Sequence, residues 1–300
     1  DHAAAVHSQV PGLPKENVVV EPGPRGTAPC IGLAAVALQI RDPQATMAVF
    51  PADHCIKDAA GFRRAIAVAS EIAQDAYLVT LGIKPSGAQT GYGYIQRGAL
   101  LEDVSSLPAY RVQRFTEKPD AVAAQEFVDS GQYYWNGGIF VWRVATILAE
   151  MERLLPDLSA GLQTLTRDWG SGGFSETLAR TWEKVPRTTI DYGIMERAAR
   201  VAVVPVDIGW DDVGNWSTLS ELVGSDQQGN VVHGSGRTEL LDCTNTYLHT
   251  TAGRLVAAIG LDGFVVVDTP DAVLICPKSQ AQAVRDVVDR LKANGLQDYL

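Results

Sequence analysis

The chain has 300 residues, of which 46% are hydrophobic and 20% are charged, and its net charge is −10. This length supports one large domain or a medium domain with a small one, and the acidic balance argues against a nucleic-acid binder, which would show a basic face. The four cysteines, at positions 30, 55, 243 and 276, lack CxxC spacing and no apolar run reaches the roughly 18 residues of a membrane span, so we expect a cytoplasmic protein without nucleic-acid or membrane partners.

Apolar strand-like runs alternate with helical patterns from residue 1 to about residue 222. This alternation indicates βαβ units and a mainly parallel sheet. The start of the chain reads like the interior of a helix, so the chain is expected to begin within a domain. Thr27 is the expected N-cap of the next helix, and residues 84–93 are expected to form a Gly-rich loop. Helices are expected over residues 27–40, 59–73, 122–129, 216–222 and parts of 144–198, and strands over 18–20, 45–50, 77–82, 110–115, 133–142 and 201–206.

The composition changes near residues 225–230, beyond which short β segments are separated by Gly, Asp and Asn. Short strands at such regular spacing suggest a sandwich, a barrel or a β-solenoid. One helix over residues 280–293 follows them. We therefore expect a first domain over residues 1–224 and a second over residues 225–300, whose β-rich surface could assemble a homodimer.

Two polar segments follow predicted strands in the first half of the chain. Ligands of open parallel sheets bind outside the carboxyl ends of the strands, so side chains at these positions are candidate substrate ligands. Asp53 could hold Mg²⁺, which takes one or two carboxylates plus substrate phosphates, or it could cap the next helix. Glu117 and Lys118 could meet sugar hydroxyls and a phosphate, or they could form a solvated surface pair.

Two further segments carry similar chemistry. The amide of Asn136, which precedes two glycines, both donates and accepts and so suits vicinal hydroxyls, although a β-bulge explains this segment equally well. Asp211 and Asp212 lie between two tryptophans and could supply a second metal ligand or an N-capping turn. Such groups at the strand ends of one sheet suit phosphoryl or nucleotidyl transfer, where catalysis is largely positioning and charge neutralisation. The sequence has no GxSxG, HExxH or Cys/His metal motif, which disfavours hydrolase and zinc chemistry.

Seven segments occur in the order typical of one enzyme family. They are EPGPRGTAP at 21–29, PADH at 51–54, TGYGYI at 90–95, FTEKP at 115–119, WNGGIF at 135–140, TIDYGIME at 189–196 and WDDVGNW at 210–216. Together they resemble the bacterial mannose-1-phosphate guanylyltransferases, a branch of the sugar nucleotidyltransferases. The EKP segment is shared with many such transferases, whereas PADH and the EPxxR-TAP segment narrow the resemblance to the branch that uses mannose and GTP.

The resemblance implies an α/β fold, with a Rossmann-like, GT-A-like nucleotidyltransferase domain of mixed sheet followed by a short left-handed β-helix domain. It also implies that GTP and mannose 1-phosphate give GDP-mannose and pyrophosphate. In this reaction Asp53 and Asp212 would hold Mg²⁺, and Lys118 would neutralise the sugar phosphate. The other substrate-binding positions that it implies are Glu117, Asn136, Gly137, Asp191, Gly91, Tyr92 and Gly93 on the sugar side, and Arg25 and Thr27 near the nucleotide.

Three departures separate this sequence from the family pattern. The Gly-rich GGxGxRxWPxSR loop that would cradle the GTP phosphates is absent, which favours a truncated chain over a protein unable to bind GTP. Gly26 stands where the family has Asn, and Gly137 stands where it has Ser. Two other functions stay open: a related transferase for another base or hexose, such as dTTP with glucose 1-phosphate, and a sugar-nucleotide-binding subunit without catalysis. Retention of both Asp53 and Asp212 argues against the second.

Overall fold

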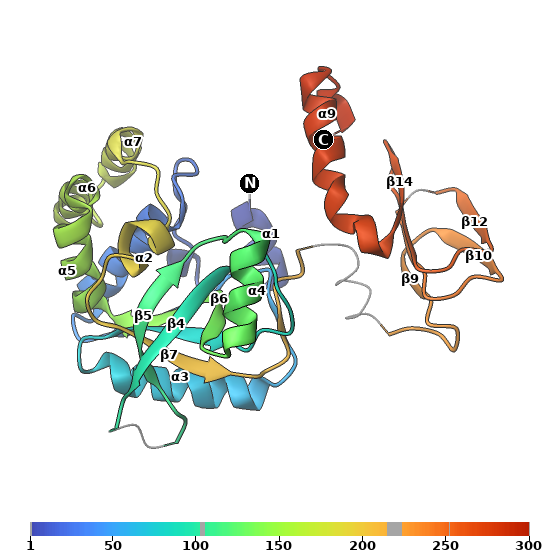
Figure 1. The fold of residues 1–300 in the computed structure, drawn as a ribbon. Helices are drawn as coiled ribbons and strands as arrows, with labels where there is room; N and C mark the ends of the chain where they lie inside the picture. The colour runs from blue at the N-terminus through green and yellow to red at the C-terminus, as the bar shows by residue number, and fades with distance from the viewer. Residues whose placement is uncertain (1, 103–105, 215–223, 252, 300) are drawn as a thin grey trace. The chain divides into compact units, whose positions relative to one another are not determined.

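The computed structural model describes residues 2–102, 106–214, 224–251 and 253–299, and the chain divides into two compact units (Figure 1). The first unit comprises Asp1–Ala52 and Ile56–Trp210, and the second comprises Asp53–Cys55 and Asp211–Leu300. The short segment that carries Asp53 therefore belongs to the same unit as the C-terminal third of the chain. The domain limits of 1–224 and 225–300 stay a prediction.

A six-stranded sheet lies at the centre of the first unit, in the order β1-β6-β3-β7-β5-β4. Its strands are β1 Thr46–Val49, β3 Leu78–Ile83, β4 Gly93–Leu100, β5 Tyr110–Thr116, β6 Tyr133–Arg143 and β7 Val201–Val206. Among these described strands only β3 and β7 pair in parallel; every other pairing is antiparallel. The expectation of a mainly parallel sheet is therefore wrong, because buried apolar runs report burial on both faces but not the direction of the neighbouring strand. The mixed sheet implied by the family resemblance is confirmed.

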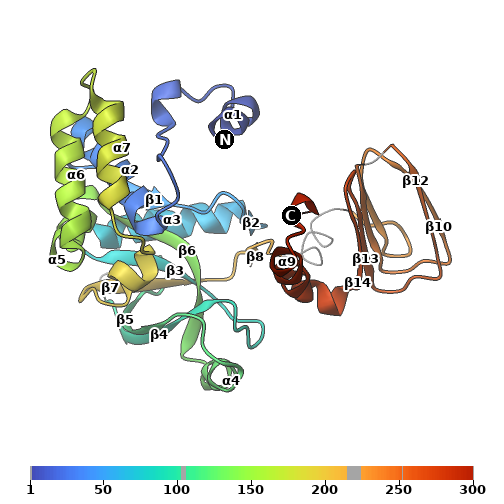
Figure 2. The same ribbon diagram turned by 90° about the horizontal axis from the view of Figure 1, so that it is seen from above.

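Helices cover both faces of this sheet (Figure 1, Figure 2). The first face carries α2 Thr27–Arg41, α5 Val144–Leu154, α6 Pro156–Asp168 and α7 Phe174–Lys184, and the second carries α3 Ala59–Ala73 and α4 Ala121–Ser130. Side chains of a strand alternate between its faces. Accordingly Val201 and Val203 of β7 join the apolar core on the first face, and Ala202 and Val204 join the core on the second.

Helix α3 and strand β7 have the limits that the sequence predicts. The carboxylate of Asp58 accepts a hydrogen bond from the backbone N–H of Gly61 at 2.8 Å, and so caps the start of α3. Asp53 therefore does not cap this helix, and that alternative to a metal-binding role is excluded.

Two other predictions for the first unit are wrong, and one strand was not predicted. Residues 18–20 form no strand, since no described strand pairs with them and an extended segment needs a ladder partner. Thr27 is the first residue of α2, and its N-cap is Gly26 with φ of 88°. Strand β4 was not expected, and the sequence places a loop up to Gly93, where this strand begins. The helix expected over residues 216–222 lies outside the described residues.

The strands of the second unit form a β-solenoid. Strands β9 Val231–Gly234, β11 Tyr247–Thr250 and β13 Phe264–Asp268 make one parallel ladder, and β10 Arg237–Leu241 and β12 Leu255–Ile259 make another. Val231, Tyr247 and Val265 stand in register and are buried, so successive turns of the chain stack a small apolar core. Strand β14 Val273–Pro277 adds antiparallel to β13, and α9 Val284–Ala293 follows. Of the three expected architectures, the solenoid is the one observed.

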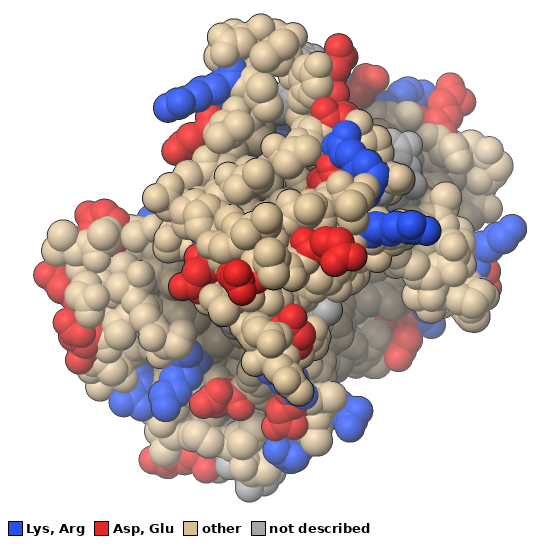
Figure 3. All heavy atoms as spheres, turned by 90° about the vertical axis from the view of Figure 1, so that its right-hand side faces the viewer, with Lys and Arg blue, Asp and Glu red and all other residues tan. Residues whose placement is uncertain are grey.

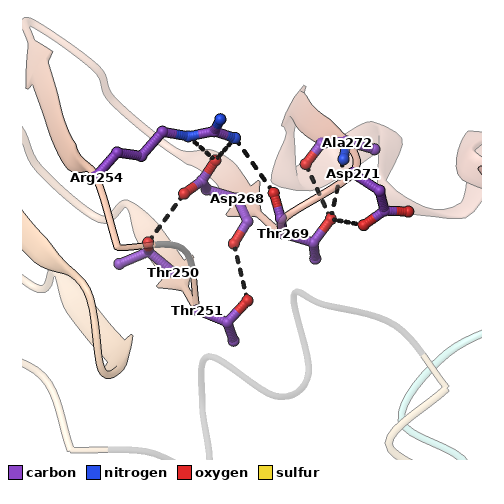
Figure 4. A network of polar contacts seen from close by, with 7 residues as sticks. All are labelled: Thr250, Thr251, Arg254, Asp268, Thr269, Asp271 and Ala272. Atoms are coloured by element: carbon purple, nitrogen blue, oxygen red, sulfur yellow. Dashed lines mark hydrogen bonds and ion pairs between the residues drawn. The ribbon is translucent and has the colours of Figure 1, made fainter.

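A polar network joins the ends of three solenoid strands (Figure 4). The carboxylate of Asp268, which is 1% exposed, accepts hydrogen bonds from the hydroxyl of Thr250 at 3.0 Å and from Nε of Arg254 at 2.9 Å. The hydroxyl of Thr269 donates to Asp271 at 2.8 Å in the turn before β14. Hydrogen bonding to Arg254 holds the pKa of Asp268 below its usual range, so this buried group stays charged and paired at neutral pH.

We expect Asn230→Ala to destabilise the solenoid by about 2 kcal/mol, because the buried Asn230 amide serves two backbone groups. Its Nδ2 donates to the carbonyl of Cys243 at 2.8 Å, and its Oδ1 accepts from the N–H of Thr246 at 3.1 Å. Hydrogen exchange of the peptide that contains β11 measures the change. Gln228→Ala, at an exposed position of the same turn, is the matched control. Equal exchange rates in the two variants would contradict this role of Asn230.

The described surface carries both signs of charge. On the face drawn in Figure 3, acidic and basic side chains are interspersed and no continuous basic area is visible. None of the described helices has the length and apolar character needed to cross a lipid bilayer.

Candidate active site

The register of the sheet brings Asn136 and Glu117 together in the first unit. Gly82 at the end of β3 and Gly93 at the start of β4 both pair with Asn136 of β6. Tyr94 pairs with Thr116, so Glu117 emerges from β5 beside the start of β4. A Cβ atom on Gly93 would lie 2.4 Å from Oε2 of Glu117 and 3.3 Å from Cβ of Asn136. Because Gly93 has no side chain, Glu117 and Asn136 can both lie close to its backbone.

Asp191 is the next member of the site. It opens a five-residue π-helical turn, Asp191–Met195, and its Oδ1 accepts a hydrogen bond from Nδ2 of Asn136 at 2.8 Å. Oδ1 of Asn136 accepts from the N–H of Gly138 at 3.2 Å, so both ends of the amide are engaged. Burial, and then the charge of Glu117, raise the pKa of Asp191.

Lys118 lies beside Glu117 at the end of β5. Its Nζ donates to Oε1 of Glu117 at 2.8 Å, and this hydrogen bond raises the pKa of Lys118. The Glu117 side chain is 12% exposed and that of Lys118 is 62% exposed, so the carboxylate is withdrawn from solvent while the ammonium group faces it. Lys118 has φ of 45°, a left-handed conformation that is uncommon for a residue other than glycine and is often found at functional sites.

Glu196 joins these residues, although the sequence did not single it out. The charges of Glu117 and Asp191 act on its carboxylate. Burial is the main cause that raises the pKa of Glu196. Its place in the TIDYGIME segment was the available signal. We call Glu117, Lys118, Asn136 and Asp191 the sugar-side site from here on.

The remaining predicted sugar-side positions surround an aromatic group. The ring of Tyr92 packs edge-on against Trp135, with centroids 5.0 Å apart, and against Trp210 at 5.5 Å. A Cβ atom on the exposed Gly91 would meet no atom within 4 Å. At Gly137 a Cβ would lie 3.1 Å from Cγ1 of Ile83, so the Ser of the family pattern would need a small shift of that side chain.

The two residues predicted near the nucleotide are engaged with other parts of the first unit. Nη2 of Arg25 donates to the carbonyl of Glu183 in α7 at 3.1 Å. The hydroxyl of Thr27 accepts a hydrogen bond from the backbone N–H of Ile190 at 2.8 Å. Both side chains therefore also hold neighbouring segments in place.

The charges of three carboxylates, Asp53, Asp211 and Asp212, act on His54 in the second unit, and we call these aspartates the acidic set. Oδ1 of Asp53 lies 4.0 Å from Nε2 of His54, and the Asp53 side chain is 85% exposed. The charges of all three aspartates favour protonated His54, yet burial outweighs them and lowers the pKa of this histidine. His54 is therefore neutral at pH 7. The described residues contain no group of three or more His, Cys, Asp or Glu with the geometry of a metal site.

The turn that carries Asp211 and Asp212 is shaped by their own side chains. Oδ1 of Asp211 accepts from the N–H of Val213 at 2.7 Å, and Oδ1 of Asp212 accepts from the N–H of Gly214 at 3.2 Å. Val213 has φ of 48°, a costly conformation for a β-branched residue. The charges of both predicted metal ligands, Asp53 and Asp212, favour the protonated form of His54, and so does the charge of Asp211.

Comparison with known proteins gives one consistent family. Residues 3–229 match the family model described as nucleotidyl transferase, and residues 236–291 match the MannoseP isomerase/GMP-like beta-helix domain. The chain is 39% identical to the mannose-1-phosphate guanylyltransferase of Escherichia coli (strain K12), over 99% of this chain and 63% of that protein. It is also 39% identical to the xanthan biosynthesis protein XanB of Xanthomonas campestris pv. campestris (strain B100), over 97% of this chain and 61% of that protein. It thus spans less than two thirds of the length of these curated relatives.

A solved structure gives the same answer. The mannose-1-phosphate geranyltransferase of Thermus thermophilus superposes with a TM-score of 0.81 at 36% identity, over 96% of this chain and 81% of that chain. The similarity covers both the nucleotidyl transferase region and the solenoid. The chain belongs to the nucleotidyl transferase family, among relatives that carry the name mannose-1-phosphate guanylyltransferase.

Proposed function

We propose that the protein forms GDP-mannose and pyrophosphate from GTP and mannose 1-phosphate. The observation that carries this proposal is the sugar-side site, where a cation, a carboxylate and a locked amide meet at one end of the sheet. A phosphate oxygen of mannose 1-phosphate attacks the α-phosphorus of GTP in line. The new bond joins that oxygen to the α-phosphorus, the bond from the α-phosphorus to the bridging oxygen breaks, and pyrophosphate leaves with the electron pair.

The sugar-side residues position the attacking phosphate. Lys118 neutralises the phosphate, and its raised pKa keeps it charged through neutral pH. Glu117 accepts hydrogen bonds from mannose hydroxyls. Asn136, whose amide is fixed by Asp191 and Gly138, offers its remaining N–H to the sugar. Positioning of this kind supplies much of the catalysis in phosphoryl and nucleotidyl transfer.

Mg²⁺ fits the chemistry of the acidic set. Two of its members, Asp53 and Asp212, would hold the ion as hard oxygen ligands, and the phosphates of the substrate with water would complete its shell. A neutral His54 adds no positive charge that would repel the ion. When bound, Mg²⁺ offsets negative charge on the α-phosphate.

The complete gene product tests the proposal. With Mg²⁺, GTP and mannose 1-phosphate it is expected to release pyrophosphate, and without either substrate it is not. A marked preference for dTTP or UTP, or for glucose 1-phosphate, would replace this substrate pair by that of a related transferase. Calorimetric binding of GDP-mannose without any turnover would instead support a non-catalytic binding subunit.

We expect Lys118→Ala to raise the KM for mannose 1-phosphate by about tenfold or more while the KM for GTP stays within twofold, because a charge-assisted contact to phosphate is lost. Steady-state pyrophosphate release at varied concentrations of each substrate measures both values. Lys184→Ala, at an exposed position on α7, is the matched control. An unchanged KM for the sugar phosphate would refute the role given to Lys118.

A further inference from the structure

The segment just before the π-helical turn is held by the start of helix α2. The backbone N–H of Ile190 donates to the hydroxyl of Thr27 at 2.8 Å. The N–H of Ala28 donates to the carbonyl of Thr188 at 3.3 Å, and the N–H of Thr188 donates to the carbonyl of Arg25 at 3.0 Å. The first N–H groups of a helix have no partner within it, so the Ala28 contact also satisfies a free donor. Three hydrogen bonds thus join the two segments.

Gly26 makes this close contact sterically feasible. It has φ of 88° and ψ of 175°, a region that glycine alone adopts readily. A Cβ at this position would lie 2.3 Å from the carbonyl oxygen of Thr188. The Asn of the family pattern has no room here, and the departure at position 26 is therefore part of the contact between the segments.

The contact is one residue away from the sugar-side site. Ile190 is buried and is followed directly by Asp191. Oδ1 of Asp191 accepts from the amide of Asn136 at 2.8 Å, and this bond fixes which way the amide faces. The position of Asp191 depends on the backbone that precedes it, and that backbone is tied to Thr27.

We propose that Thr27 is a positioning residue for the sugar side of the reaction. Its hydroxyl holds the backbone of Ile190, the backbone sets Asp191, and Asp191 orients Asn136 toward mannose 1-phosphate. The family resemblance places Thr27 near the nucleotide, so the two assignments predict effects on different substrates. The inference rests on the proposed function, since it divides the roles of residues between its two substrates.

Thr27→Val and Thr27→Ser separate these assignments in the complete gene product. Valine keeps the shape of threonine but cannot accept the hydrogen bond from Ile190, whereas serine can. We expect Thr27→Val to raise the KM for mannose 1-phosphate about tenfold, with the KM for GTP within twofold of the wild type. Thr27→Ser is expected to keep both values. A rise in the KM for GTP alone, or no change in either value, would overturn the proposal.

A double-mutant cycle tests whether Thr27 acts through Asp191. We expect Thr27→Val to have no further effect on the KM for mannose 1-phosphate in an Asp191→Ala background. Effects that multiply independently would show that the hydroxyl acts by another route and would overturn the proposal.

Amide hydrogen exchange tests the positioning role of Thr27 without a measurement of turnover. We expect faster exchange over residues 188–196 in Thr27→Val and wild-type exchange in Thr27→Ser, because the Ile190 N–H loses its acceptor only in the first. Unchanged exchange in Thr27→Val would overturn the positioning role. Absence of pyrophosphate release by the wild type would reject the proposed function without affecting this readout, so the two failures are distinguishable.

Discussion

Asp212→Asn and Asp53→Asn are each expected to lower the rate of pyrophosphate release at least a hundredfold at fixed Mg²⁺, with the fold retained. Asparagine keeps the size of aspartate but removes the negative charge that a hard divalent cation prefers. The charges of both aspartates act on the same histidine, His54, in the second unit. If both carboxylates hold Mg²⁺, loss of either charge weakens its binding.

The Mg²⁺ dependence of the rate makes this prediction specific. Each variant should need a higher Mg²⁺ concentration for half-maximal rate, because it holds the ion with one carboxylate fewer. Asp207→Asn, at an exposed position shortly before the acidic set, should behave like the wild type. If the variant at position 53 or 212 keeps a near-normal rate and a normal Mg²⁺ requirement, the aspartate at that position is not a metal ligand.

The sequence predicted best those elements whose limits depend on local signals and not on contacts with distant parts of the chain. Helix α3 has Asp58 before it and an apolar stripe along one face, so both its start and its period can be read directly. Strand β7 is a short apolar run rich in valine with both faces buried. In the second unit, turn residues separate each short strand, and their regular spacing indicated a sandwich, a barrel or a solenoid, of which the solenoid is observed.

Strand direction could not be predicted in the same way. Strand β5 runs antiparallel to both β4 and β7, so the rule for parallel strand ends does not apply to Glu117. This residue still lies near Asn136, with Gly93 between them, because the start of β4 pairs with β6 and lies beside the end of β5. The structure thus places these two side chains near each other, although the strand-end rule by which the sequence singled them out does not hold in this sheet.

Side-chain partners were equally inaccessible to sequence patterns. A threonine before a helical run predicts an N-cap, yet the hydroxyl of Thr27 accepts from Ile190, which is far away along the chain. The role of Glu196 depends on the folding of the π-helical turn against β5. Hydrogen-bond partners distant in sequence are set by the packing of helices such as α2 against this turn, which local propensity does not encode.

Gly93→Ala is expected to lower kcat/KM for mannose 1-phosphate about a hundredfold without unfolding the protein, because displacing a binding group by about 1 Å can cost this much. The new Cβ would lie 2.4 Å from Oε2 of Glu117, too close for the carboxylate to stay in place. The clashing atom is the end of a side chain and not backbone, so Glu117 can move while the sheet keeps its register. Its hydrogen bond to Lys118 would then be lost or moved.

Gly87→Ala, in the loop that precedes β4, is the control, because a Cβ there would meet no atom within 4 Å. Thermal unfolding of both variants should match the wild type. The effect should also vanish in a Glu117→Ala background, since the displaced carboxylate is already absent. A Gly93→Ala enzyme with normal kcat/KM would show that Glu117 does not need its observed position, and would remove it from the contacts that hold the sugar.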